Sequence, residues 1–167
     1  MEDNTERKEF YFGYLNKKEQ ERNAPLQITN ISIDKLRPFS RHTFKLYEGQ
    51  RFTDMVGSVK ANGIFIPIIV QPIEFEDGFY EILSGHNRTE AAKAAGFTEI
   101  PAVIRKHLTR DEAMLIVTES NLIQRSFANL SHSERAAAMS MHHEAIKSQG
   151  KRTDLINEIE NLLNQVQ

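Results

Sequence analysis

Cysteine is absent from the 167 residues of the chain. A disulfide framework and a thiolate metal site are therefore excluded. The sequence also lacks an apolar N-terminal stretch of signal length and any run that approaches a membrane span, for which about 20 consecutive apolar residues are needed. We therefore expect a cytoplasmic protein with no membrane partner.

An excess of one charge is also missing. The chain has 21 Lys and Arg residues against 23 Asp and Glu residues, a formal net charge of −2 and a pI near 6.3. Duplex DNA is held by a concentrated basic face, so this composition argues against a surface built mainly to neutralise many phosphates. Any nucleic-acid contact must then be local or belong to another segment.

The length fits one well-cored domain and an additional helical piece. We expect a charged, loosely attached and partly disordered leader over residues 1–25, an α+β core over 26–108 and a helical extension over 109–167. A small mixed sheet with packed helices is the expected core. Apolar spacing and turn residues predict strands at 28–33, 67–70, 79–83 and 101–105, helices at 52–62 and 88–95, and a loop over 39–50.

Two capping boxes indicate where helices of the extension begin. Thr109 with Glu112, and Ser131 with Glu134, have the spacing in which each side chain bonds the other residue's backbone N–H. We expect the second of these helices to run to about residue 148 and to end at Gly150. A separate amphipathic stretch is expected over 155–166.

A first polar cluster follows the strand over 79–83. Gly85 lies where that strand ends and the next helix begins, and Arg88 falls in the first helical turn. Backbone N–H groups at a helix N-terminus, together with a cation, favour an anion. Neighbouring His86 either donates to such an anion or caps the turn. An ordinary tight turn with a solvated arginine is the alternative, since Walker and dinucleotide-binding patterns are both absent.

A second polar cluster lies over residues 119–125. It offers a carboxylate, two amides and a guanidinium within seven residues. Arg88 and Arg125 would straddle one polyphosphate, while Glu119 or Asn121 would hold a divalent ion against the same oxygens. The alternative is the polar end of a helix with routine ion pairs.

Other polar groups give no catalytic assignment. The adjacent His142 and His143 project about 100° apart on a helix, which is wrong for chelating one zinc ion, and an HExxH pattern is absent. Ser84 precedes a glycine but lacks the GxSxG elbow of a serine nucleophile.

The motifs together resemble a known family. The combination is similar to the N-terminal domain of ParB plasmid and chromosome partition proteins, which has a sulfiredoxin-like core. The stretches that carry the resemblance are SVKANGI at 58–64, PIIV at 67–70, YEILSGHNR at 80–88, AAKAAG at 91–96, IPAVI at 100–104 and ESNLIQR at 119–125.

This resemblance implies a site for CTP with Mg²⁺. Carried over by position, one group of residues would bind the nucleotide: Ser84, Gly85, His86, Asn87, Arg88, Gln124 and Arg125. Glu119 and Asn121 would hold the magnesium ion. Slow CTP hydrolysis is a further implication of the family.

The resemblance also implies partners. Family members form a homodimeric clamp on DNA when nucleotide binds, and they bind DNA mainly through a helix-turn-helix segment that this chain does not contain. A partition ATPase and association with the nucleoid or a plasmid follow in the same way. The chain departs from the pattern in having Asn87 for the first of two arginines, an additional residue between Asn121 and Gln124, and RHTFK at 41–45 for an upstream glutamine-proline-arginine stretch.

Two other functions stay open. The same superfamily contains a free-serine kinase, so a small-molecule phosphotransferase is one alternative. A nuclease is the other, and it is disfavoured because no clustered Asp and Glu set suits two-metal chemistry. Sulfiredoxin chemistry is excluded because the chain has no cysteine.

Overall fold

The computed structural model describes residues 13–14, 16–18, 20–22, 24–40, 45–124 and 131–164, without the side chains of 122–124 and 149–164. The chain forms two compact units. One comprises Met1–Arg37 with Glu48–Leu108, and the other comprises Pro38–Tyr47 with Thr109–Gln167. Each unit is described by itself below.

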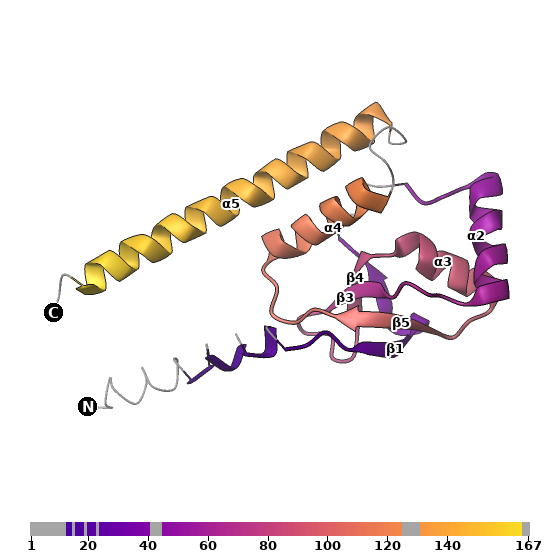
Figure 1. The fold of residues 1–167 in the computed structure, drawn as a ribbon, viewed down its shortest axis with the longest axis horizontal. Helices are drawn as coiled ribbons and strands as arrows, with labels where there is room; N and C mark the ends of the chain where they lie inside the picture. The colour runs from indigo at the N-terminus through magenta and orange to yellow at the C-terminus, as the bar shows by residue number, and fades with distance from the viewer. Residues whose placement is uncertain are drawn as a thin grey trace. The chain divides into compact units, whose positions relative to one another are not determined.

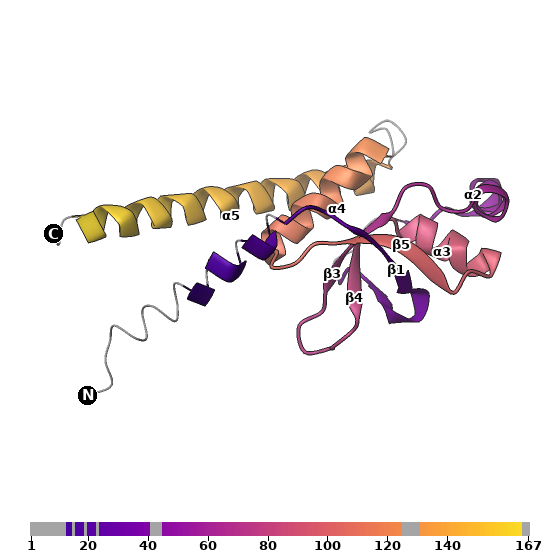
Figure 2. The same cartoon turned by 60° about the horizontal axis from the view of Figure 1, so that its bottom comes forward.

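A five-stranded mixed sheet forms the centre of the first unit (Figures 1 and 2). Its strands are β1 (Ile28–Ser32), β2 (Leu36–Pro38), β3 (Ile68–Pro72), β4 (Tyr80–Ser84) and β5 (Glu99–Ile104), in the order β1-β5-β3-β4-β2. Strand β5 is antiparallel to β1 and parallel to β3, which forms an antiparallel hairpin with β4. The small mixed sheet expected from the sequence is confirmed, and the short strand β2 was not foreseen.

Two helices accompany this sheet: α2 (Gly49–Asn62) and α3 (His86–Ala95). Helix α2 ends as expected at Gly63, whose N–H donates to the carbonyl oxygen of Val59 at 2.8 Å. It begins at Gly49, slightly before the expected end of the preceding loop. A short 3₁₀ helix over Ile33–Lys35 joins β1 to β2.

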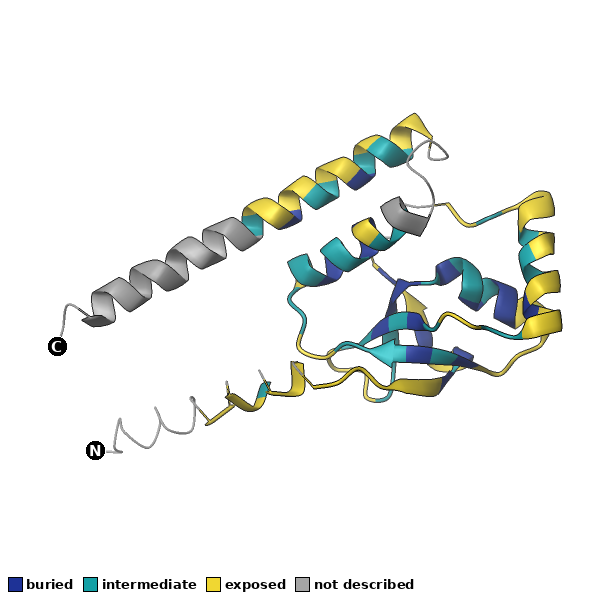
Figure 3. Cartoon of the chain, viewed as in Figure 1, coloured by how far each residue is buried: buried dark blue, intermediate teal, exposed yellow. Residues whose placement is uncertain are grey.

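The core of the first unit lies between the central strands and α3, where buried residues concentrate in Figure 3. Ile68, Leu83 and Ile100 have 0% exposure, and burial of one such side chain contributes about 1.5–3 kcal/mol. Ala91 and Ala92 are also fully buried. Their small side chains allow α3 to pack closely.

The second unit contains α4 (Arg110–Gln124) and α5 (His132–Asn164), which run antiparallel and side by side in Figures 1 and 2. Both predicted capping boxes are confirmed. Glu112 Oε2 accepts from the Thr109 N–H at 2.7 Å, and the Glu112 N–H donates to Thr109 Oγ1 at 3.3 Å. The Ser131–Glu134 box makes the corresponding bonds at 3.0 and 3.2 Å.

The expected end of the last helix at Gly150 is wrong, because α5 continues without a break to Asn164. Glycine inside a helix is less favourable than alanine by about 1 kcal/mol, but it keeps its N–H donor and does not clash with the preceding turn as proline does. No described helix has both the length and the apolar character that a membrane crossing requires.

Candidate functional site

The turn between β4 and α3 requires glycine. Gly85 has φ +105°, a conformation that residues with a Cβ rarely adopt. A Cβ at this position would lie 2.5 Å from Ile68 Cγ2 and 3.1 Å from Ile68 Cβ. Since Ile68 is fully buried in β3, it has little room to move. Both the backbone angle and the contact with β3 therefore select glycine.

Helix α3 begins directly after this turn, with Gly85 as its N-cap and no side-chain capping bond. The Thr89 N–H and the Thr89 hydroxyl both donate to the Gly85 carbonyl oxygen, at 2.9 and 3.2 Å, which fixes the first turn. A helix N-terminus carries partial positive charge and favours an anion. The observed start at residue 86, earlier than expected, places the helix end directly at the glycine.

The other predicted residues of this first cluster differ in exposure. Ser84 and His86 are buried, with 2% and 8% exposure, whereas Asn87 is half-buried. Ser84 is the last residue of β4, and His86 is the first residue of α3. All three, with Gly85 and Arg88, lie along one short segment, so the structure brings the first cluster together at the end of the strand.

Arg88 is held more firmly than a solvated cation would be. Its Nη1 donates to the carbonyl oxygens of Ile66 at 2.5 Å and Pro67 at 2.7 Å. Partial burial lowers the pKa of the Arg88 guanidinium from its ordinary value, yet arginine stays protonated at any physiological pH. No carboxylate pairs with Arg88 among the residues that the structure describes. The site therefore contains a partly desolvated positive charge beside a helix N-terminus.

The loop that accepts these bonds was missed in the sequence. Ile66 and Pro67 precede Arg88 by more than 20 residues and contribute only backbone oxygens, so no side-chain pattern marks them. The one available signal was Pro67, which cannot continue a sheet ladder and therefore marks an irregular segment before β3.

The second predicted cluster lies on α4. Glu119 is exposed, and Asn121 is half-buried with its side-chain amide donating to the Val117 carbonyl oxygen at 2.7 Å. Gln124 is the last residue of α4, but its side chain is outside the described part, as is Arg125 altogether. Helix α4 is continuous through all these positions up to Gln124.

The two clusters belong to different compact units. The hypothesis that both clusters bind one ligand stays a prediction from the sequence. The upstream stretch at 41–45, where the chain departs from the family pattern, lies outside the described residues except for Lys45. The Lys45 N–H donates to Glu134 Oε1 at 3.1 Å within the second unit.

Magnesium usually takes one or two protein oxygens and keeps several waters. The Glu119 carboxylate and the Asn121 amide oxygen are ligands of the right kind. No group of three or more His, Cys, Asp or Glu residues suited to a metal occurs among the described residues. His142, considered for zinc, has its Nδ1 3.3 Å from the Thr118 hydroxyl.

Comparisons of the sequence and of the fold with known proteins point to the same family. The ParB N-terminal domain family matches residues 16–122. A probable chromosome-partitioning ParB of Coxiella burnetii is 32% identical over 142 residues, which cover 80% of this chain and 47% of that protein. A Pnob8-like ParB-N domain has 19% identity and a TM-score of 0.58, with 81% of this chain and 52% of the other covered.

A further structure shares the fold. It is a C-terminally truncated chromosome-partitioning ParB from Caulobacter crescentus, complexed to the centromeric parS site, with 24% identity and a TM-score of 0.57 over 71% of this chain and 58% of the other. The chain spans 47% of the length of the Coxiella burnetii protein and 33% of the length of a probable plasmid-partitioning ParB of Deinococcus radiodurans. On the match over residues 16–122, the chain belongs to the ParB N-terminal domain family.

Proposed function

We propose that the chain is the nucleotide-binding part of a ParB-type partition protein and that it binds CTP with Mg²⁺. The observation that carries the proposal is the pairing of a helix N-terminus at Gly85, which has no side-chain capping bond, with the partly buried Arg88 guanidinium. Nucleotide binding by this family is implied by the resemblance of the GHNR segment at 85–88. The local chemistry independently favours an anion.

The phosphates would meet the first cluster. Backbone N–H groups at the start of α3 supply directed donors, and Arg88 supplies a planar guanidinium suited to two phosphate oxygens at once. Asn87 supplies an amide where the family commonly has an arginine, so this chain offers one positive charge fewer. We therefore expect weaker electrostatic attraction and a smaller loss of affinity with added salt than in members with both arginines.

The second cluster would complete the site. We propose that Glu119 and Asn121 hold Mg²⁺, and that Gln124 and Arg125 contact the phosphates. Bound Mg²⁺ would neutralise charge that develops on the phosphate oxygens during slow hydrolysis. Glu119 is exposed, so it is free of the packing constraints of the α4 core.

Isothermal titration calorimetry with each of the four ribonucleoside triphosphates, with and without Mg²⁺, tests the proposal. We expect heat for CTP in the presence of Mg²⁺ and little for the other three. Arg88→Ala should abolish it. Lys93→Ala is the matched control, because Lys93 is an exposed cation on the same helix that pairs with Glu90 at 2.8 Å. Equal loss of binding in both variants would contradict the assigned role of Arg88.

The same preparation distinguishes the alternatives. Phosphate release from CTP, reduced in Glu119→Gln, would support slow hydrolysis. Turnover of ATP or ADP with free serine, in the absence of a CTP response, would instead indicate a phosphotransferase. Magnesium-dependent plasmid cleavage that disappears in Glu119→Gln would indicate a nuclease.

The proposal extends to DNA. We propose that nucleotide binding closes a homodimeric clamp on a centromere-like site, that a helix-turn-helix segment reads the site as in the family, and that a partition ATPase acts with the clamp at the nucleoid or a plasmid. Support comes from the family and from the relative solved with parS. Site-specific crosslinking of two copies of the chain, increased by CTP with Mg²⁺, would test the closure of the dimer.

A further inference from the structure

The Arg88 guanidinium joins two segments that are distant in sequence. Nη1 has two N–H groups, and it makes two bonds, to the carbonyl oxygens of Ile66 and Pro67. Nε and Nη2 carry three more N–H donors. One arginine can therefore bond the loop with one edge and an anion with the other.

The guanidinium also lies against the turn that opens α3. A Cβ built at Gly85 would be 3.3 Å from Arg88 Cζ, so the charged group sits directly beside the helix N-terminus. An anion bound at that terminus would lie within reach of the remaining donors. The loop carbonyls and the anion would then be ligands of the same guanidinium.

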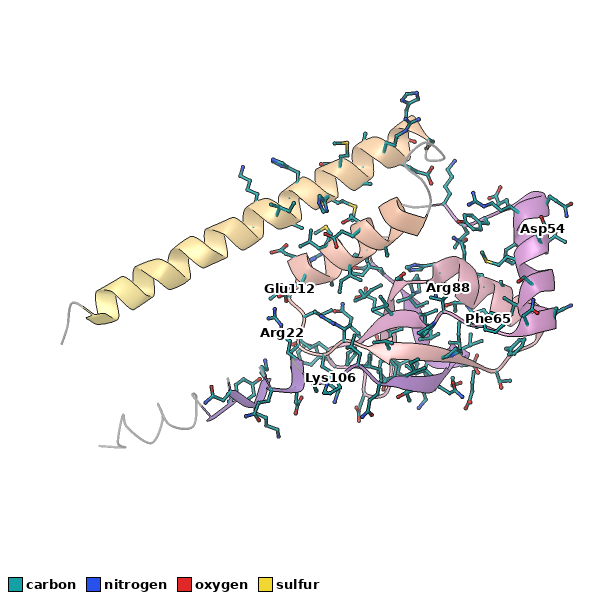
Figure 4. All side chains as sticks on the ribbon, viewed as in Figure 1. Arg22, Asp54, Phe65, Arg88, Lys106 and Glu112 are labelled. Carbon is teal, nitrogen blue, oxygen red and sulfur yellow. The ribbon has the colours of Figure 1, made fainter. Side chains whose placement is uncertain are left out.

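The loop itself presents two large apolar side chains to solvent. Phe65 is 82% exposed and Ile66 is 67% exposed, whereas the next isoleucine, Ile68, is fully buried in β3. Figure 4 labels Phe65 in this loop and Arg88 on α3. Exposed apolar side chains do not anchor a loop, so the two bonds from Arg88 become important for its position.

We propose that Arg88 is a positioning residue that couples anion binding at the start of α3 to the loop carrying Phe65 and Ile66. The inference rests on the proposed nucleotide site. A phosphate that takes the Nε and Nη2 donors fixes the plane of the guanidinium, and this plane directs Nη1 at the two carbonyl oxygens. Bound nucleotide therefore strengthens a restraint that the ligand-free protein already has, and further reduces the mobility of Phe65 and Ile66. Lysine cannot reproduce the effect, because its single ammonium lacks the two-edged planar geometry.

The absence of tryptophan makes the loop directly observable. Phe65→Trp introduces a single indole at the exposed tip, and acrylamide quenching and emission anisotropy then report its mobility. The control is Phe75→Trp, which places the indole at a fully exposed position in the turn between β3 and β4. Each reporter is prepared with Arg88 and with Arg88→Lys, or with Arg88→Gln if the lysine form does not fold by circular dichroism.

Without ligand, replacement of Arg88 should raise quenching and lower anisotropy of the Phe65→Trp reporter, and should leave the Phe75→Trp reporter unchanged. Adding CTP with Mg²⁺, or inorganic tripolyphosphate, should reduce quenching at position 65 only when Arg88 is present. Calorimetry on the same samples measures how much ligand is bound.

Two results would overturn the coupling. One is a loop reporter that is equally quenched with Arg88 and with its replacement in the ligand-free protein. The other is bound ligand, shown by calorimetry, that leaves the loop reporter unchanged in the Arg88 protein. If no triphosphate binds at all, the proposed function fails, while the ligand-free comparison still decides whether Arg88 holds the loop.

Discussion

Gly85→Ala should destabilise the first unit more than a typical glycine replacement. Two effects add. The φ of +105° is unfavourable for alanine, by about 1–3 kcal/mol for a non-glycine residue in a sparsely populated region. The new Cβ would also lie 2.5 Å from Ile68 Cγ2, and overpacking in a core destabilises by about 1–3 kcal/mol. The sum is about 2–6 kcal/mol, a large part of the roughly 5–15 kcal/mol that stabilises a domain.

Gly96→Ala separates these two effects. Gly96 ends α3 with φ +87°, and nothing lies within 4 Å of a Cβ built there. Gly96→Ala therefore has the unfavourable backbone conformation without the steric clash. Urea denaturation followed by circular dichroism measures the free energy of unfolding of both variants. We expect Gly85→Ala to be destabilised by about 1–3 kcal/mol more than Gly96→Ala.

The partner side chain provides an independent check. Ile68→Ala removes the Cγ2 atom that the new methyl would meet. It also leaves a cavity, which lowers the free energy of unfolding by about 2–5 kcal/mol. Combined with Gly85→Ala, it should destabilise by less than the sum of the two single changes. Equal unfolding free energies for the two glycine variants, or strict additivity in the double variant, would refute the steric reasoning.

Three further predictions concern the helices and the N-terminal segment. Thr109→Ala should lower the free energy of unfolding, measured by urea denaturation, by about 1 kcal/mol through loss of the α4 cap. Thr109→Ser, which keeps the hydroxyl, should have a smaller effect. Thr118→Val should lower it by about 1–3 kcal/mol, because the buried hydroxyl that bonds the Met114 carbonyl at 3.0 Å and faces His142 is lost; no change would contradict that contact. The hydrogen bond from His107, 2.7 Å from Glu21, lowers the pKa of that carboxyl, so the contact should be fully present above the ordinary value of 4.5 and should weaken as pH falls below it. Hydrogen exchange of residues 16–22 against pH measures this, with Glu21→Gln insensitive over the same interval.

Much of the fold followed from local chemistry. The helix ends at Gly63 and Gly96, the strand after Pro67 and the two capping boxes each depend on residues close together in sequence, and each is confirmed. The predicted helix end at Gly150 also depended on one local residue, and it is wrong. A glycine stops a helix only where the chain turns away, and the residues around it continue the helical hydrogen bonding.

The candidate site was less accessible to sequence reasoning. The GHNR segment did not by itself distinguish an anion site from an ordinary turn with a solvated arginine, and the family resemblance made the difference. The structure adds what neither source contained: Arg88 is bonded to two backbone carbonyl oxygens from a loop before β3. Backbone acceptors have no residue identity, so no motif can encode them.

This contact changes the argument about Arg88 itself. A solvated arginine gives up its bound water and most of its side-chain freedom when it binds phosphate. A guanidinium whose Nη1 is committed to Ile66 and Pro67 keeps its position before any ligand arrives, so less side-chain freedom is lost on binding. Arg88→Lys retains the charge but loses this preorganisation. Its affinity for CTP should therefore fall mainly through a more unfavourable binding entropy, which calorimetry resolves, and an unchanged entropy with a reduced enthalpy would assign the loss to phosphate bonds alone.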